Sequence, residues 1–181
     1  MTTACKLVIL DRDGIINQDS LNYIKSPDEF ILLPDSAHAI ARLNAAGYRV
    51  AVATNQSGIA RGLYDEHLLE AIHDKMRGGV RAVGGHIELV EYCPHMPDSG
   101  CPCRKPKAGL LLTIAQKLDC SLIDVPFVGD RVSDIQAAEA VGAQPIMVLS
   151  SMTDQVALSA YPHVPVFHSL AAYVDTLLAA Q

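Results

Sequence analysis

The sequence predicts an α/β domain with a doubly wound, mostly parallel sheet, and three observations support this. Short apolar runs recur along the chain, helical patterns separate them, and the runs are continuously apolar instead of alternating with polar residues. Parallel strands that are covered by helices on both faces have this pattern. The 181 residues, half of them hydrophobic, can bury one core of ordinary size, and no linker or repeat divides them. We therefore expect a single domain over residues 1–181.

Six apolar runs are the predicted strands: KLVIL at 6–10, RVAVAT at 49–54, IELVEY at 87–92, VPFVG at 125–129, PIMVL at 145–149 and VPVF at 164–167. Apolar residues at helical spacing predict five helices: SAHAIARLNAAG at 36–47, DEHLLEAIHDKM at 65–76, AGLLLTIAQKLD at 108–119, SDIQAAEAVG at 133–142 and SLAAYVDTLLAA at 169–180. Gly47 ends the first of these helices, as glycine commonly does.

Composition excludes several classes of protein. The net charge of −6 lacks the basic surface of a nucleic-acid binder, and no stretch reaches the roughly 18 apolar residues of a membrane span. The start MTTACKLVILDRDG has no cationic segment before its apolar run, so we expect a strand and not a signal peptide. Three of the five cysteines are clustered, which favours a reducing compartment, with Cys5 and Cys120 as small buried hydrophobic side chains. We expect a cytoplasmic monomer without nucleic-acid or membrane partners.

Polar clusters follow the first four predicted strands. They are DRDG at 11–14, TNQSG at 54–58, a cysteine-rich loop ending in RKP at 104–106, and GDRVSD at 129–134. In doubly wound sheets, ligands bind beyond the carboxyl ends of the strands. We therefore expect these clusters to form one site.

Carboxylates dominate the first and fourth clusters. Asp11 and Asp13 are two positions apart and would share one side of a regular strand, and Asp130 follows a neighbouring strand. Crowded carboxylates repel each other unless a cation lies between them, and their hard oxygens suit Mg²⁺. The alternative is that aspartates at strand ends only cap turns.

The second and third clusters suit a phosphate group. Thr54 supplies a hydroxyl, the turn that follows it exposes backbone N–H groups, and Lys105 adds a positive charge. Each feature alone is also found in ordinary turns and solvated loops. Magnesium, a lysine and a hydroxyl around one phosphate are, however, the groups that phosphoryl transfer requires.

The motifs LDRDGIIN, TNQSG, RKP and VGDRVSD, in this order from Leu10 to Asp134, resemble those of the haloacid dehalogenase superfamily of phosphatases. The resemblance implies a Rossmann-like fold in which Asp11 attacks phosphorus and forms an aspartyl-phosphate. Asp13 would act as general acid and then as general base. The remaining implied roles are Mg²⁺ ligation by the carboxylates of Asp11 and Asp130 and the backbone carbonyl of Asp13, orientation of the metal site by Asp134, and phosphoryl stabilisation by Thr54 and Lys105.

Two alternatives belong to other classes of protein. A response-regulator receiver also has acidic clusters in an α/β sheet, but its phospho-accepting aspartate typically follows a middle strand, whereas here the pair follows the first. A zinc-stabilised binding module without turnover would share the cysteine-rich loop. Only phosphate release in the presence of Mg²⁺ separates the second alternative from an enzyme.

Many members of the superfamily insert a cap domain between motifs, and this chain has no room for one. Asp13 and Thr54 are 41 positions apart, Thr54 and Lys105 are 51 apart, and predicted strands, helices and the cysteine loop fill both intervals. Substrate specificity would then come from short loops. The residues we expect to bind substrate are Asp19 and Asn22, in a stretch similar to the family's substrate loop, together with Asn55, Gln56, Ser57, Arg104 and Arg131.

The cysteine loop CPHMPDSGCPC matches a structural zinc site. Its Cys93-x-His95 and Cys101-x-Cys103 pairs give the Cys₃His ligand set of tetrahedral zinc, although the spacing is tighter than in most zinc fingers. A reduced cluster without metal is the alternative. The loop leads directly into Arg104 and Lys105, so zinc would hold these two cations in place.

Within the superfamily, the zinc loop beside RKP, the missing cap and the string TNQSGIARG resemble the heptose 1,7-bisphosphate 7-phosphatases. That resemblance implies removal of the 7-phosphate during ADP-heptose synthesis for lipopolysaccharide or S-layer glycans. Histidinol-phosphate phosphatases share the aspartate pair and a similar loop and remain the alternative. The string GIARG at 58–62 and the position of Arg131 favour the heptose enzymes, and Arg104 and Arg131 suit a sugar that carries a second phosphate.

Overall fold

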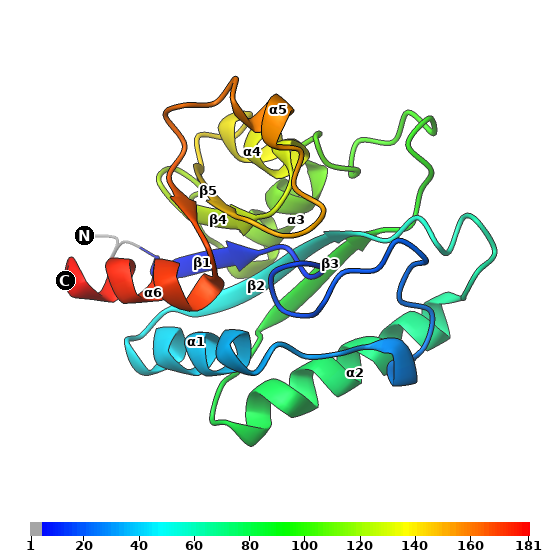
Figure 1. Cartoon of the computed structure of the whole chain (residues 1–181), viewed down its shortest axis with the longest axis horizontal. Coiled ribbons are helices and arrows are strands. Elements are labelled where there is room, and N and C mark those ends of the chain that lie inside the picture. The colour runs from blue at the N-terminus through cyan, green and yellow to red at the C-terminus, as the bar shows by residue number, and fades with distance from the viewer. Residues whose placement is uncertain (1–4) are drawn as a thin grey trace.

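The computed structural model describes residues 5–181, and its centre is one six-stranded sheet in the order β3-β2-β1-β4-β5-β6 (Figure 1). Every neighbouring pair of strands is parallel, so the predicted doubly wound fold is confirmed. The strand order reverses beside β1, which is where such sheets bind ligands. The strands are β1 (Leu7–Leu10), β2 (Arg49–Asn55), β3 (Leu89–Cys93), β4 (Pro126–Gly129), β5 (Gln144–Val148) and β6 (Val166–Phe167).

Helices cover both faces of the sheet (Figure 1). Their positions agree with the predicted helical patterns, and α5 and a short 3-10 helix, η1, occur in addition. The helices are η1 (Pro27–Glu29), α1 (Pro34–Ala45), α2 (Glu66–Ala82), α3 (Gly109–Leu118), α4 (Val132–Glu139), α5 (Gln155–Leu158) and α6 (Leu170–Ala179). In the described part of the chain, none of them is long and apolar enough to cross a bilayer.

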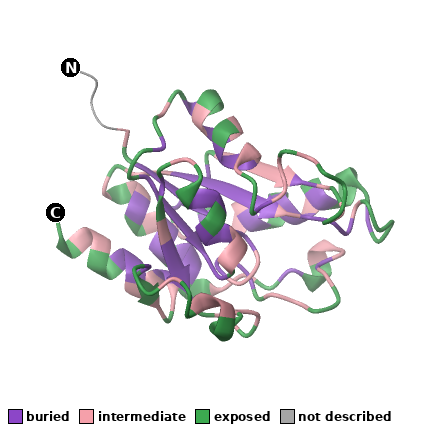
Figure 2. Ribbon diagram, turned by 90° about the horizontal axis from the view of Figure 1, so that it is seen from above, coloured by how far each residue is buried: buried purple, intermediate pink, exposed green. Residues whose placement is uncertain are grey.

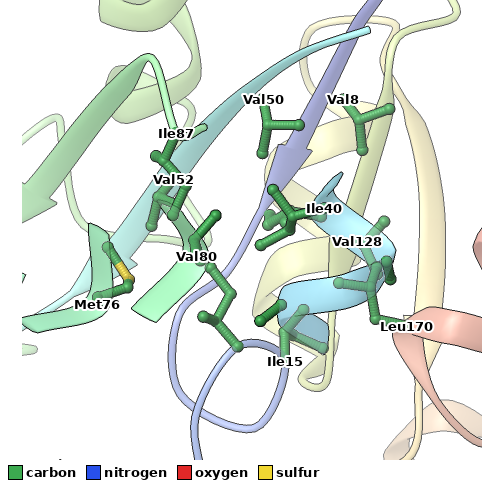
Figure 3. Packing of buried hydrophobic residues seen from close by; sticks show 14 of the residues in the cluster. Val8, Ile15, Ile40, Val50, Val52, Met76, Val80, Ile87, Val128 and Leu170 are labelled. Atoms are coloured by element: carbon green, nitrogen blue, oxygen red, sulfur yellow. The ribbon is translucent and has the colours of Figure 1, made fainter. Parts of the chain in front are cut away.

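Two hydrophobic clusters lie on opposite faces of the sheet, because successive strand residues point to opposite sides. Val8 and Leu10 of β1 pack with residues of α1, α2 and α6, and Figure 3 shows this cluster from close by. Leu7 and Ile9 pack with residues of α3 and α4 on the other face. Figure 2 shows the buried strands between partly exposed helices. The core thus fixes β1, which carries the first motif at its carboxyl end.

Two elements differ from the prediction. Helix α2 continues six residues beyond Met76 and passes through Gly78 and Gly79. A Cβ at Gly79 would lie 2.4 Å from a methyl carbon of Leu32, so this glycine permits close packing inside the helix instead of ending it. Strand β3 is only half-buried along most of its length because it is an edge strand, and it carries Glu91 where the central strand β1 is wholly apolar.

The cysteines outside the loop also differ from the prediction. Cys5 and Cys120 form a disulfide with a Cα–Cα distance of 5.8 Å, so their interpretation as two separate hydrophobic side chains is wrong. The sheet brings the segment before β1 next to the end of α3, although the two cysteines are 115 positions apart. The guanidinium of Arg49 contacts Cys120 Sγ at 3.3 Å. Sequence patterns could not reveal a proximity that the fold alone creates.

Candidate active site

The four motif loops meet at the carboxyl edge of the sheet, around a cavity of about 680 Å³. Its lining comes from the loops after β1, β2 and β3, from the start of α4, and from Met152 in the loop after β5. Of the predicted site residues, those that line the cavity are Asp11, Asp13, Asp19, Thr54, Asn55, Gln56, Ser57, Cys101, Arg104, Lys105, Arg131 and Asp134. Segments distant in the sequence therefore form one site, as the positions of the motifs predict.

Lys105 lies at the centre of the charged groups in this cavity. Its Nζ is 3.0 Å from Asp11 Oδ1 and 2.8 Å from Asp134 Oδ1, and it donates to the carbonyl of Ala53 at 2.9 Å. Burial alone would lower the pKa of Lys105, but the two carboxylates outweigh it and raise the pKa above its ordinary value. Lys105 is therefore a fixed, buried cation.

Three buried carboxylates lie close enough together to bind one divalent cation. Asp11, Asp130 and Asp134 each offer one ligand oxygen, and these atoms lie within 4.8 Å of one another. Burial raises the pKa of Asp11 well above its ordinary value, and the nearby Asp134 and Asp130 add to this effect while Lys105 opposes it. Oδ1 of Asp130 is buried and has no hydrogen-bond partner. An unpaired buried oxygen in a crowded acidic cluster fits a hard cation such as Mg²⁺.

The carboxylate of Asp13 is turned away from that cluster and held by donors on both oxygens. Oδ1 accepts from Arg12 Nε at 3.0 Å and Nη2 at 2.8 Å and from Asn17 Nδ2 at 2.9 Å, while Oδ2 accepts from Gln56 Nε2 at 3.0 Å. Burial raises the pKa of Asp13, but the Arg12 charge and the bonds from Asn17 and Gln56 together bring it below its ordinary value. Asp13 is therefore ionised at neutral pH in this state.

Gln56 connects the first two motifs. Besides Asp13, its Nε2 donates to Thr54 Oγ1 at 2.9 Å, and its Oε1 accepts from the hydroxyl of Tyr64 at 2.7 Å. Burial raises the pKa of Tyr64 to about 12, so this hydroxyl keeps its proton. A Cβ at Gly58 would lie 2.2 Å from the Tyr64 ring, which explains why a glycine ends the TNQSG motif. Gln56 thus orients two side chains in addition to lining the cavity.

Asn55 holds the segment that carries Lys105. Its Nδ2 donates to the Lys105 carbonyl at 3.1 Å, and its Oδ1 accepts from the Lys105 N–H at 3.1 Å. The two bonds fix the main chain of a loop that has no regular secondary structure. The TNQSG motif predicts that Asn55 binds substrate, whereas both ends of its amide hydrogen-bond to the main chain of Lys105.

The mouth of the cavity carries cationic side chains. Arg131 Nη2 is 2.9 Å from Asp19 Oδ2, which ties the loop after β1 to the start of α4. The Arg61 guanidinium lies 5.6 Å from the centre of the Tyr23 ring, and its Nε contacts Ser57 Oγ at 3.4 Å. Asn22, also expected to contact substrate, is exposed and does not line the cavity.

The cysteine loop gathers its four predicted ligands. Sγ of Cys93 lies 3.4 Å from Nδ1 of His95, 3.7 Å from Sγ of Cys101 and 3.1 Å from Sγ of Cys103. All four ligand atoms lie within 4.8 Å of one another. Three sulfurs and one imidazole nitrogen at these separations could hold one tetrahedral zinc ion.

Of the three cationic residues Arg104, Lys105 and Lys107, two hydrogen-bond to carbonyls of the cysteine loop and one contacts the carboxylates. Lys107 Nζ donates to the carbonyls of Gly100 at 3.2 Å and Cys101 at 2.9 Å, and Arg104 Nη1 donates to the carbonyl of His95 at 3.3 Å. Only Lys105, between them in the sequence, turns inward to the carboxylates. This arrangement favours Lys105 over Lys107 as the lysine that binds phosphate.

Three contacts of the site were not anticipated from the sequence. Arg12 is fully buried, and its Nη1 lies 3.3 Å from Nε2 of the buried His73 in α2. Ser150 and Thr153, in the loop after β5, bond to Asp130. Because Ser150 lies two residues beyond a parallel strand, the rule that selected the other strand ends could also have selected it. The sequence gives no comparable signal for the contact between Arg12 and His73.

Comparisons with known proteins agree with this geometry. The HAD-hydrolase-like family model matches residues 102–174. The D-glycero-beta-D-manno-heptose-1,7-bisphosphate 7-phosphatase of Pseudomonas aeruginosa is 50% identical over 173 residues, which cover 95% of this chain and 97% of that protein. The enzyme of the same name from Bordetella bronchiseptica is 53% identical over 143 residues, covering 79% of this chain and 80% of that one.

Solved structures point to the same family. The crystal structure of D,D-heptose 1,7-bisphosphate phosphatase from B. bronchiseptica, complexed with magnesium and phosphate, matches with a TM-score of 0.92 at 46% identity over 97% of this chain and 99% of that chain. The corresponding phosphatase from Burkholderia thailandensis matches with a TM-score of 0.74 at 41% identity over 96% of this chain and 99% of that chain. The chain therefore belongs to the D-glycero-beta-D-manno-heptose-1,7-bisphosphate 7-phosphatase family of HAD-like hydrolases.

Proposed function

We propose that this protein hydrolyses the 7-phosphate of D-glycero-beta-D-manno-heptose 1,7-bisphosphate with the help of Mg²⁺. One arrangement carries the proposal: Asp11 lies in a cavity beside Lys105 and two further carboxylates, one of which has an unpaired buried oxygen. The β anomer is the one in the names of the relatives that are about half identical to this chain. The product would enter ADP-heptose synthesis.

In the first step, a carboxylate oxygen of Asp11 attacks phosphorus, and the bond between phosphorus and the sugar oxygen breaks. The aspartyl-phosphate forms while Lys105 and the Thr54 hydroxyl stabilise the transferring phosphoryl oxygens. Asp13 donates a proton to the leaving alkoxide. Because Arg12 and the amides of Asn17 and Gln56 favour its ionised form, Asp13 has to take up this proton before the step.

After the first step Asp13 has lost its proton and is an ionised carboxylate, the form that its surroundings favour. In the second step this carboxylate acts as the base. It removes a proton from a water molecule, which attacks the phosphorus of the aspartyl-phosphate and regenerates Asp11. Mg²⁺, held by the carboxylates of Asp11 and Asp130 and the carbonyl of Asp13, would neutralise phosphate charge and orient it for in-line attack. The Asp134 carboxylate accepts from the Arg131 N–H at 3.1 Å and pairs with Lys105, so it would orient the groups around the ion.

We further propose that the cysteine loop binds one structural zinc ion through Cys93, His95, Cys101 and Cys103. Four protein ligands fill a tetrahedral shell and leave no open position for chemistry. The ion would order the loop, and the bonds from Lys107 and Arg104 back to loop carbonyls would transmit that order to Lys105. Arg104 and Arg131 line the cavity and would bind the phosphate that remains on the sugar.

A comparison of substrates tests this function. Phosphate release from both anomers of the heptose bisphosphate and from histidinol phosphate is measured with Mg²⁺, and kcat/KM is compared. We expect the β-heptose bisphosphate to exceed histidinol phosphate by about 100-fold, because only the bisphosphate engages the cations at the mouth of the cavity. A preference for histidinol phosphate would refute the substrate but not the chemistry. No release from any phosphate monoester would refute both.

A further inference from the structure

Asp130 is held by a loop to which the motifs give no role. Ser150 Oγ donates to Asp130 Oδ2 at 2.6 Å, and Thr153 Oγ1 donates to the Asp130 carbonyl at 2.7 Å. The two hydroxyl residues also bond to each other, since the Ser150 N–H donates to Thr153 Oγ1 at 3.0 Å. A further bond, from the Met152 N–H to Ser150 Oγ at 3.0 Å, fixes the serine hydroxyl. The loop therefore holds both the side chain and the main chain of Asp130.

The loop after β1 also packs against Oδ2 of Asp130, through Gly14. A Cβ at Gly14, in the loop after β1, would lie 2.3 Å from Asp130 Oδ2 and 3.4 Å from Ser150 Cβ. Gly14 has a φ of +83°, which side chains rarely adopt, so both space and backbone conformation favour glycine there. Oδ2 is thus enclosed between Gly14 and Ser150, whereas Oδ1 is buried without a partner.

This asymmetry defines the orientation of the carboxylate. A carboxylate held only at its Cβ can turn about χ2 and exchange its two oxygens, but a hydrogen bond to one of them selects one orientation. Ser150 makes that bond to Oδ2, which leaves the partner-free Oδ1 available to a cation. Groups that hydrogen-bond to a metal ligand without binding the metal themselves commonly set both the geometry and the affinity of the site.

We propose that Ser150, supported by Thr153, is a positioning residue for the cation ligand Asp130. The inference rests on the Mg²⁺ site of the proposed function. Neither hydroxyl residue lines the active-site cavity, although Met152 between them does. Ser150 therefore acts on the affinity for Mg²⁺ through Asp130 and not on the sugar.

The test is Ser150→Ala in the zinc-loaded protein, prepared without chelator. Mg²⁺ affinity is measured by titration calorimetry without substrate, and again as the Mg²⁺ concentration for half-maximal phosphate release. Both should weaken about 10- to 100-fold, the range found when an outer partner of a metal ligand is removed. At saturating Mg²⁺, KM for the sugar should equal that of the wild type. Ser150→Thr keeps a hydroxyl and should recover most of the affinity.

Ser151→Ala is the matched control, because this adjacent serine is exposed and should bind Mg²⁺ like the wild type. Thr153→Val is a second, independent variant: it removes the bond to the Asp130 carbonyl and should weaken Mg²⁺ binding by a smaller factor. The inference is overturned if Ser150→Ala binds Mg²⁺ like the wild type, or if Ser151→Ala weakens binding equally. Because calorimetry needs no substrate, a wild-type protein that binds Mg²⁺ but does not hydrolyse the bisphosphate would refute the proposed function alone.

Discussion

The two clusters of potential metal ligands are built in opposite ways. The acidic cluster combines Asp11, which follows β1, with Asp130 and Asp134 at the end of β4 and in α4, and all three side chains are buried. The cysteine cluster lies within eleven consecutive positions of one loop, from Cys93 to Cys103, and only Cys93 is buried. The fold assembles the first cluster, whereas local sequence assembles the second.

This difference also appears in the charges around each cluster. Lys105 is buried within the acidic cluster and offsets part of its negative charge. The cysteine loop contains no regular secondary structure between β3 and α3, and the bonds from Lys107 to the carbonyls of Gly100 and Cys101 stay within this segment. We therefore expect the acidic site to be preformed and the cysteine loop to depend on its ion for order.

The largest expected effect is on the acidic cluster. Asp11→Asn keeps the shape of the side chain but removes the attacking carboxylate, and phosphate release should fall by at least about 10³-fold. The variant also removes one negative charge from a crowded group, so its melting temperature should equal or exceed that of the wild type. The measurements are phosphate release and thermal unfolding. The exposed Asp28 gives the control Asp28→Asn, and a wild-type rate in Asp11→Asn would exclude Asp11 as the nucleophile.

A substitution in the cysteine cluster is expected to reduce phosphate release by a smaller factor than Asp11→Asn. Cys93→Ser should lose zinc and reduce phosphate release about tenfold, because Lys105 is then less well placed, while Mg²⁺ affinity stays near that of the wild type. Metal analysis and phosphate release measure both effects. Asp98→Asn, on the exposed part of the same loop, should keep one zinc per chain and full activity. A verified zinc-free protein with an unchanged rate would contradict the role of the loop in holding Lys105.

The smallest expected effect is on the pH dependence of folding stability, and it compares the buried His73 with the exposed His38. Burial, with the nearby Arg12 and Arg77, lowers the pKa of His73 to about 3. The unfolded chain binds a proton at this histidine below about pH 6.5 and the folded chain does not until about pH 3, so folding stability is lost as pH falls through this window. The loss approaches about 1.4 kcal/mol per pH unit in the middle of the window.

His73→Gln removes this titration and can keep an acceptor for Arg12. The free energy of unfolding, measured by denaturant titration at several pH values between 4 and 6, should therefore depend less on pH in the variant than in the wild type. His38→Gln, at an exposed position in α1, should leave the dependence unchanged. Equal pH dependence in His73→Gln and the wild type would show that His73 is not held neutral by the fold.

Some features of the site were predictable because they depend on residues that are close together in the sequence. Asp11 follows β1, Thr54 lies at the end of β2, and Lys105 lies in the loop after β3, and the parallel sheet brings these strand ends to one edge. The four predicted zinc ligands are close together in the sequence. In contrast, the two bonds from Asn55 to the Lys105 backbone join positions that are 50 apart, and no local pattern encodes their geometry.

The alternation of strands and helices, the positions of the motifs and the composition of the cysteine loop can be recognised from the sequence alone, because periodicity and spacing act over a few residues. The Cys5–Cys120 disulfide, the burial of Arg12 against His73 and the hydrogen bond from Ser150 to Asp130 are apparent only in the folded chain. Each of these contacts joins segments that are distant along the chain. Their proximity depends on the order of the strands and on the side of the sheet that each helix covers, and both follow from packing the whole core.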